Sequence, residues 1–194
     1  MDKLKELLSK DSRYEYENIN KNSKQTNASV FLPVLFKNGD YSILLLKRSK
    51  NLSAHSDEIC LPGGTFEEND FNLLNTAYRE MREETGVAQD NVKLISSLSK
   101  ENTRTGYIIQ PFIVLLKENV KIKVDGKEII DYMFLSIPEF INNNNKRDYY
   151  FLSNNLLISK PAYIINNQLI WGATASIIKE FLSIITADNE RNKK

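Results

Sequence analysis

Two apolar segments joined by an Asn-Gly turn place the strongest constraint on how this chain folds. The segments SVFLPVLF (29–36) and YSILLLKR (41–48) are rich in strand-forming residues, and Asn38 and Gly39 lie between them. An Asn-Gly pair readily adopts the positive φ angles that a tight hairpin turn requires. The sequence therefore predicts two adjacent antiparallel strands, and with them a β-sheet.

The residues after this hairpin predict a strand, a glycine-rich loop and a helix. EICLPGG (58–64) is a short apolar run ending in a glycine pair, and FNLLNTAYREMREETG (71–86) has helical periodicity up to a glycine that suits a C-terminal cap. Further strands are expected at VKLISSL (92–98), YIIQPFIVLLK (107–117) and EIIDYMFL (128–135), where Pro111 fits an edge or a bulge. A short helix is expected at 137–141 and a solvated loop at 142–145. Strand, loop and helix in this order are expected around a phosphate site.

Amphipathic helices are predicted near both ends of the chain. Leu4, Leu7 and Leu8 have helical spacing in the first ten residues, and a longer apolar stripe follows LIWG, formed by Ile177, Ile178, Phe181, Leu182 and Ile185. Nothing in between has the composition of a linker. We therefore expect one domain at 28–186, preceded by a helix and polar lead-in at 1–27 and followed by a charged tail at 187–194.

Composition excludes several classes of partner. Lysine and arginine (26) nearly balance aspartate and glutamate (25) in the 194 residues, so no strong positive field is available to hold a long nucleic acid. A small ligand fits better. The single cysteine, Cys60, has no partner for an internal disulfide, and no signal sequence or membrane-spanning apolar run is evident. These features predict a cytoplasmic protein that does not enter a membrane.

Three glutamates share one face of the predicted helix. At about 100° per residue, Leu74, Ala77, Tyr78 and Met81 form an apolar stripe that would pack on the sheet, and Glu80, Glu83 and Glu84 form a neighbouring acidic face. Like charges at this spacing destabilise a helix by roughly 0.2 to 0.5 kcal/mol per pair. Arg79 can hold Glu83, and a hard divalent cation suits the remaining oxygens. The pattern predicts Mg2+, with Mn2+ as a substitute.

A run of charges on a helix is usually a solvated surface. Here the run follows Pro62-Gly63-Gly64 and ends at Thr85-Gly86, so that glycine backbone, acidic helix and helix stop come at fixed offsets. This context favours a functional site.

The spacing of these residues resembles the Nudix box, the signature of the Nudix hydrolases. The matching positions are Gly64, Asp70, Arg79, Glu80, Glu83, Glu84 and Gly86. The resemblance implies an α/β fold, namely a Nudix-type α/β/α sandwich around a mixed β-sheet. It also implies an enzyme in which metal-activated water attacks a diphosphate linkage of a nucleotide derivative.

By position in the box, the resemblance assigns a role to each residue. Glu80 and Glu84 would be the principal metal ligands, Glu83 a further ligand or the group that positions water, and Arg79 the residue that orients the glutamates. A backbone carbonyl of Gly63 or Gly64 would complete the metal shell. The cations would neutralise the diphosphate, activate water and stabilise the leaving oxygen.

One departure from the common box bears on the substrate. Eight residues separate Asp70 from Arg79, one more than usual, and this spacing resembles the coenzyme A pyrophosphatases. The segment LLLKRSKNLSAHSDEICLPGG (44–64) is similar to their fingerprint, although Ser53 stands where an arginine is expected. Later segments extend the resemblance to about Leu182. It implies hydrolysis of coenzyme A, or a derivative, to 3',5'-adenosine bisphosphate and 4'-phosphopantetheine.

Other residues and other functions stay open at this point. Arg48, Lys50 and Arg104 are candidates for phosphate contacts, and Glu83 and Glu101 for the general base. His55 is expected in a loop, Cys60 in the packing, and Trp171 in the core or as a wall for adenine. The alternatives are a Nudix hydrolase of another nucleoside diphosphate derivative, a nucleoside triphosphate or capped RNA, and a non-catalytic binding module. A homodimer is also open.

Overall fold

Strand β1 (Thr26–Lys37) lies at the centre of the main sheet. The computed structural model describes residues 4, 6, 7, 26–153 and 155–186. The main path of the sheet runs β3-β2-β1-β7-β5, with β4 on β1, β6 on β7 and β8 on β2. Its other strands are β2 (Asp40–Arg48), β3 (Ile59–Cys60), β4 (Gly63–Thr65), β5 (Val92–Ser97), β6 (Glu101–Asn102), β7 (Tyr107–Leu116) and β8 (Ile129–Ser136).

The predicted hairpin is confirmed. β1 and β2 are antiparallel and end at the pair Lys37↔Asp40, with Asn38 at φ 54° and Gly39 at φ 84° between them. Both residues therefore adopt the left-handed conformation that an Asn-Gly pair favours. The turn fixes the register in which β1 and β2 present alternate side chains to the two faces of the sheet.

The sheet is mixed because β1 and β7 run parallel, from Thr26↔Tyr107 to Leu35↔Leu116. On the edge opposite β1, β7 pairs first with β6 and then with β5. Pro111 lies between these two pairings, because the β6 pairs end at Ile109 and the β5 pairs begin at Phe112. The proline has no N–H to donate, and it lies opposite the gap between β5 and β6 on an interior strand, rather than at the edge or bulge that was expected.

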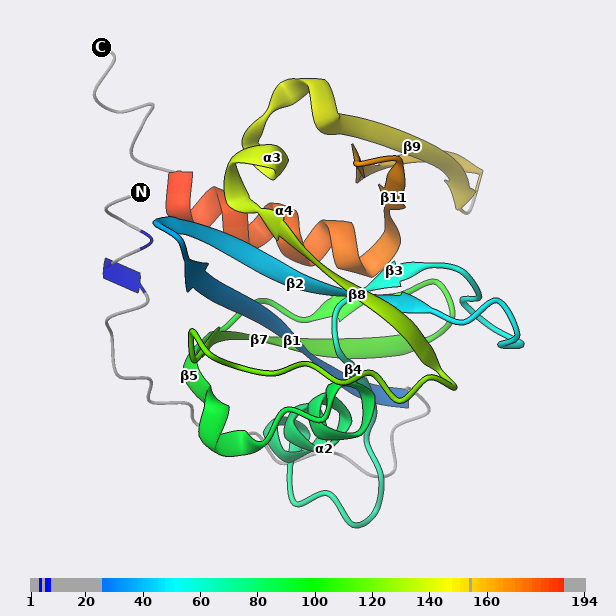
Figure 1. Cartoon of the computed structure of the whole chain (residues 1–194). Helices are drawn as coiled ribbons and strands as arrows, with labels where there is room; N and C mark the ends of the chain where they lie inside the picture. Colours follow the sequence, from blue (N-terminus) through cyan, green and yellow to red (C-terminus); the bar gives the residue numbers. More distant parts are fainter. Residues whose placement is uncertain (1–3, 5, 8–25, 154, 187–194) are drawn as a thin grey trace.

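Alternate residues of the central strands enter two separate cores. Leu32 and Val34 of β1 pack into one core with helix α4 (Gly172–Thr186), and Phe31 and Leu35 pack into the other with helix α2 (Leu73–Thr85). The two helices cover opposite faces of the sheet (Figure 1). This arrangement confirms the α/β/α sandwich, and the predicted C-terminal apolar stripe lies buried in the core formed with α4.

The structure adds a second sheet that sequence reasoning missed. It contains β9 (Lys146–Ser153), β10 (Leu156–Ile165) and β11 (Gln168–Ile170), all antiparallel. Apolar side chains such as Tyr150 and Leu152 are exposed on β9, so the usual alternation of buried and polar residues gave no signal. The predicted helix at 137–141 is α3 (Ile137–Ile141), and the exposed tract after it forms the 3-10 turn η2 (Asn143–Asn145) rather than a plain loop. Another turn, η1 (Gln89–Asn91), precedes β5.

The predicted outer segments fall largely outside the described residues. Of the N-terminal helix, Leu4 and Leu7 are helical and pack against the core that contains α4, whereas Leu8 lies outside the described residues, as does the tail at 187–194. β1 begins at Thr26, close to the predicted boundary at 28. Within the described part of the chain, no helix has the length and apolar character needed to cross a membrane.

Candidate metal and catalytic site

Helix α2 presents the glutamates because its opposite stripe is anchored in the core. The helix begins after Asn72, whose side-chain oxygen accepts the N–H of Asn75, and ends at Gly86 in the left-handed conformation. The predicted stripe packs on the sheet, with Leu74, Ala77 and Met81 buried. The acidic residues of α2 therefore emerge beside the glycine pair that forms most of β4.

Arg79 connects the acidic residues to one another and to the loop. Its Nε and Nη2 donate to the two carboxylate oxygens of Asp70, at 3.0 and 3.1 Å. Its Nη1 donates to Glu80 Oε1 at 2.9 Å and to Glu83 Oε2 at 3.1 Å, and Nη2 also reaches the carbonyl of Thr65 at 2.9 Å. The guanidinium uses its planar fork fully, which a lysine ammonium cannot reproduce.

Asp70, only a spacing landmark in the sequence, is the anchor of this arginine. The carboxylate also accepts the N–H of Glu67 and the hydroxyl of Thr76. Burial acts to raise the pKa of Asp70, but the hydrogen bonds from Arg79, Glu67 and Thr76 outweigh it and lower that pKa. Asp70 is thus a fixed anion that holds Arg79, and both of its oxygens are occupied.

Glu84 is the most deeply buried of the three glutamates. Only 4% of it is exposed, and its Oε2 accepts the N–H of Gly63 at 2.9 Å. Burial raises the pKa of Glu84 to about 8, against the hydrogen bond from Gly63, and the negative charges of Glu80 and Glu128 raise it further. A carboxylate in this position requires a compensating positive charge to remain ionised.

The two loop glycines allow the backbone and the carboxylates to approach closely. Gly63 has φ 146°, and a Cβ there would lie 2.2 Å from the carbonyl oxygen of Ser29 on β1. A Cβ at Gly64 would lie 2.4 Å from Glu80 Oε1. β1 therefore occupies the space that a side chain at residue 63 would need, and Glu80, a candidate metal ligand, occupies the space that a side chain at residue 64 would need.

The donor set fits a hard divalent cation. Among the described residues, no three His, Cys, Asp or Glu side chains converge closely enough to hold a metal ion in this arrangement. The carboxylates of Glu80 and Glu83 do not converge on a metal position because each has one oxygen bound to Arg79. Glu80 and Glu84 are nonetheless neighbours beside the glycine backbone, and burial is also the main cause that raises the pKa of Glu80. Carboxylate and carbonyl oxygens are the ligands that Mg2+ prefers.

Comparison with known proteins decides the family. A family model described as the NUDIX domain matches residues 26–154, which is more than half of the chain. The chain belongs to the Nudix family. A relative named Nudix hydrolase NudL, from Photorhabdus laumondii subsp. laumondii, is 27% identical over 161 residues, covering 79% of this chain and 82% of its own.

Solved structures confirm the Nudix fold. A NUDIX hydrolase from Nitrosomonas europaea is similar over 87% of this chain and 74% of its own, with a TM-score of 0.56 and 16% identity. The NUDIX domain of Shewanella oneidensis NrtR, complexed with ADP ribose, is similar over 64% of this chain and 81% of its own, with a TM-score of 0.51 and 17% identity. At such identities the likeness concerns the fold alone.

The predicted phosphate-binding residues of this Nudix domain lie in different environments. Arg48 is half-buried and pairs with Glu128 at 2.7 Å, and its Nε is buried without a hydrogen-bond partner in the described structure. Its charge acts on Glu84, so it lies near the glutamates. Lys50 is exposed beside Asp57. Arg104 lies over the ring of Phe151 instead, at 4.6 Å.

Of the remaining sequence candidates, Cys60 lies close enough to Glu84 for that charge to act on its thiol, whereas the structure describes no contact of Glu101, His55 or Trp171 with the glutamates of α2. Glu101, a candidate base, pairs with Lys160 of β10 at 2.9 Å. His55 is exposed beside Glu58 in the loop where it was expected. Burial raises the pKa of the Cys60 thiol to about 12, which agrees with a packing role. Trp171 is half-buried and packs edge-on against Tyr149.

Glu128 is a candidate site residue that sequence reasoning missed. It immediately precedes β8, which pairs with β2, and its Oε1 contacts Arg48. Its charge raises the pKa of both Glu80 and Glu84, so its carboxylate lies within electrostatic reach of both. Only the pairing of β2 with β8 brings it there, and no local pattern around residue 128 signals it.

Replacing Arg79 by lysine tests the network. We expect Arg79→Lys to lower kcat by about a hundredfold or more, because one ammonium cannot hold Asp70, Glu80 and Glu83 together. Metal-dependent turnover and thermal unfolding should be measured in parallel. Arg82→Lys, on the exposed side of the same helix, is the matched control and should retain activity. Equal activity in the two variants would show that the network does not organise the site.

Proposed function

We propose that this Nudix protein hydrolyses a diphosphate linkage in a nucleotide derivative, with coenzyme A or one of its derivatives as the principal substrate. The observation that carries the proposal is the buried Glu84, held by the Gly63 N–H and next to Glu80, on a helix whose Arg79 orients the acidic face. A non-catalytic module would gain nothing from ionisable groups placed against a burial penalty.

The proposed metal is Mg2+, which Mn2+ can replace. Glu80 and Glu84 would hold it, with Glu83 and a backbone carbonyl of Gly63 or Gly64 as further donors. When bound, the cation supplies charge neutralisation for the diphosphate and acidifies a water molecule. Arg79 keeps the carboxylates on one face, and the half-buried Arg48, next to Glu128, is the candidate to donate to a diphosphate oxygen. Lys50 and Arg104 are secondary candidates.

The general base is proposed among three glutamates. Glu83 is exposed and bonded to Arg79, and Glu101 is bonded to Lys160. The charge of Glu128 acts on both Glu80 and Glu84, and Arg48 is the one ion-pair partner of its carboxylate among the described residues. Its placement makes Glu128 the best candidate to accept a proton from the attacking water or to add a metal ligand.

The choice of coenzyme A rests on sequence spacing. The eight residues between Asp70 and Arg79, together with the segments up to Leu182, support it. The alternative substrate is another nucleoside diphosphate derivative, and Ser53 in place of the fingerprint arginine favours it. The ADP ribose bound to one structural neighbour belongs to that class of compound. Cytoplasmic location remains part of the proposal, and a homodimer stays open.

A substrate panel tests this choice. The purified protein should be incubated with Mg2+ and coenzyme A, ADP-ribose, NADH, dinucleoside polyphosphates and nucleoside triphosphates, and the products identified by mass. We expect 3',5'-adenosine bisphosphate and 4'-phosphopantetheine as the dominant products, and no turnover with a chelator present. Higher kcat/KM for another member of the panel would overturn the substrate, and turnover in chelator would overturn the mechanism.

The role of Glu128 has its own test. Glu128→Gln removes a charge at nearly constant shape, and we expect kcat to fall by about ten- to a hundredfold with little change in stability. The pH profile of kcat separates a base from a structural role, since loss of a base removes the acidic limb. Glu118→Gln, an exposed substitution away from the site, is the control. An unchanged rate and profile would remove Glu128 from the mechanism.

A further inference from the structure

The segment between β7 and β8 is docked on the C-terminal end of α2. The last carbonyls of a helix have no partner within the helix itself. Here the carbonyl of Glu84 accepts the backbone N–H of Asp125 at 3.3 Å. The carbonyl of Thr85 accepts the backbone N–H of Lys123 at 2.9 Å, and Val124 packs against the core that contains α2. The segment is therefore attached to the helix that carries the glutamates.

The carboxylate of Asp125 holds a tight turn directly ahead of β8. Its Oδ2 accepts the backbone N–H of Glu128 at 2.9 Å and that of Lys127 at 3.2 Å. Its Oδ1 accepts the backbone N–H of Ile129 at 2.8 Å. Burial acts to raise the pKa of Asp125, but the hydrogen bonds from these backbone groups outweigh it and lower that pKa. The ionised carboxylate thus fixes the backbone of three residues, and Glu128 is one of them.

The same turn is attached to β2 through Glu128. The Glu128 carbonyl accepts the backbone N–H of Ser49 at 2.8 Å, and the Glu128 carboxylate binds Arg48 at 2.7 Å. The Glu128 side chain is 49% exposed, so packing contributes little to its placement. The backbone of the turn therefore sets the position from which this carboxylate acts on Glu80 and Glu84.

We propose that Asp125 is a positioning residue, which holds Glu128 within reach of Glu80 and Glu84 by fixing the turn at 125–129 between α2 and β2. The inference rests on the proposed function, which gives this placement its use in hydrolysis. Asp125 acts through the backbone of Glu128, because both of its own carboxylate oxygens are bound within the turn. A residue outside the Nudix box thereby keeps the glutamate helix and Arg48 in one arrangement.

Amide hydrogen exchange of the full chain in chelator tests the placement without metal or substrate. The reporter is the N–H of Ser49, which donates to the Glu128 carbonyl and not to Asp125. We expect Asp125→Ala to speed exchange at Ser49 by about tenfold or more, because the turn no longer holds its acceptor. Asp125→Asn keeps one acceptor oxygen and should have a smaller effect. Unchanged exchange at Ser49 in Asp125→Ala would overturn the proposal.

A double-mutant cycle in hydrolysis tests whether Asp125 acts through Glu128. We expect Asp125→Ala to lower kcat by about tenfold with little change in KM, because Glu128 is displaced while contacts to the substrate remain. In the Glu128→Gln background, the same substitution should lower kcat by less than about twofold. Losses that multiply in the double variant would overturn the proposal. If Ser49 responds but the wild-type chain hydrolyses no member of the substrate panel, the proposed function fails and the placement of Glu128 by Asp125 stands.

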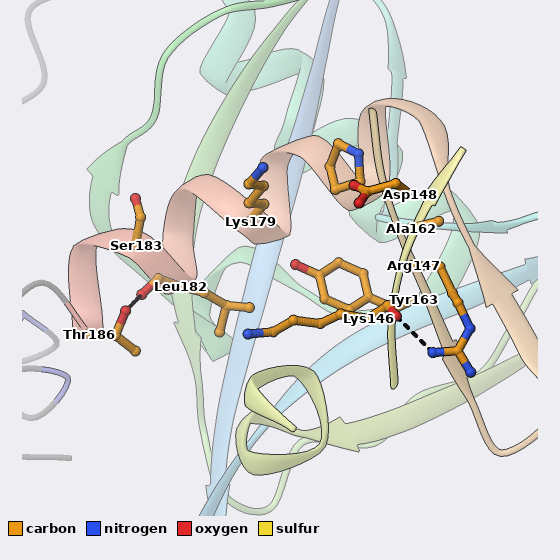
Figure 2. A pocket seen from close by; sticks show the side chains of 10 residues that line it. Lys146, Arg147, Asp148, Ala162, Tyr163, Lys179, Leu182, Ser183 and Thr186 are labelled. Carbon is orange, nitrogen blue, oxygen red and sulfur yellow. Dashed lines mark hydrogen bonds between the residues drawn. The ribbon is translucent and has the colours of Figure 1, made fainter. Parts of the chain in front are cut away.

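Two carboxylates elsewhere in the chain provide matched controls. Asp40, at the opposite end of β2 from Arg48, accepts the backbone N–H of Tyr41 at 2.8 Å, so Asp40→Ala removes a charge and a contact of the same kind. Asp148 lines a cavity between the second sheet and α4, on the face of the main sheet opposite α2 (Figure 2). Asp148→Ala therefore removes a charge alone. Both variants should keep wild-type kcat and wild-type exchange at Ser49, and an equal response in either would overturn the assignment to Asp125.

Discussion

Glu84→Gln is expected to lower kcat by about a thousandfold or more while raising the stability of the metal-free protein. The loss follows because the substitution removes the charge of a proposed metal ligand at almost constant shape. The gain follows from burial, because an amide at position 84 carries no ionisation penalty and its oxygen can still accept the Gly63 N–H. Turnover with Mg2+ and thermal unfolding in chelator measure the two effects.

The pH dependence gives the sign of the stability effect. The pKa of Glu84 is raised to about 8 in the folded protein, from 4.5, so the folded state binds more protons than the unfolded state between these values. The stability contribution is complete below pH 4.5 and is lost as the pH rises toward 8. The advantage of the variant should therefore grow over this range, to a few kcal/mol at most. Near wild-type turnover, or a stability difference that does not change with pH, would contradict this account of Glu84.

Gly63→Ala is expected to reduce the free energy of unfolding by about 3 kcal/mol or more and to abolish turnover. A Cβ at residue 63 would lie 2.2 Å from the Ser29 carbonyl and 2.6 Å from Val30 Cα, both backbone atoms of the central strand that have no room to move. The φ of 146° adds strain for any residue with a side chain. Denaturant unfolding gives the energy, and Mg2+-dependent hydrolysis gives the activity.

Gly126→Ala separates the strain from the clash. Gly126 also has a positive φ, 73°, but a Cβ there would meet nothing within 4 Å. We expect it to cost only about 1 kcal/mol. If the two variants unfolded within about 1 kcal/mol of each other, the close packing of the glycine loop on β1 would not be what fixes the site.

The parts of the fold that were predictable have local causes. The Asn38-Gly39 turn, the apolar stripe of α2 and the glycine cap at Gly86 are each encoded within one turn or one helix. The same holds for the placement of Glu80 next to Glu83 and next to Glu84, because helical spacing alone determines it. The resemblance to the Nudix box then supplied the sandwich and the mixed sheet.

The rest depends on contacts between distant segments. Glu128 reaches the acidic cluster only because β8 pairs with β2, and Glu101 is drawn to Lys160 by the second sheet. In the sequence, Asp70 was notable only for its distance from Arg79. In the structure, both of its carboxylate oxygens bind Arg79, nine residues further along the chain. Strand β9 was not predicted because its apolar residues, such as Tyr150 and Leu152, are exposed and give no alternation of buried and polar positions.

The pairing of β4 with β1 has a consequence for motion. The residues Ala28 to Val30 of β1 are bonded to β4 on one edge and to β7 on the other. The glycine loop is therefore attached to the central strand of the sheet, and the amide hydrogens of β1 that lie in this pairing should exchange with solvent more slowly than those of the exposed loops. The glycine loop would act as a rigid floor of the proposed site, and any adjustment to the shape of a substrate must come from the surrounding walls.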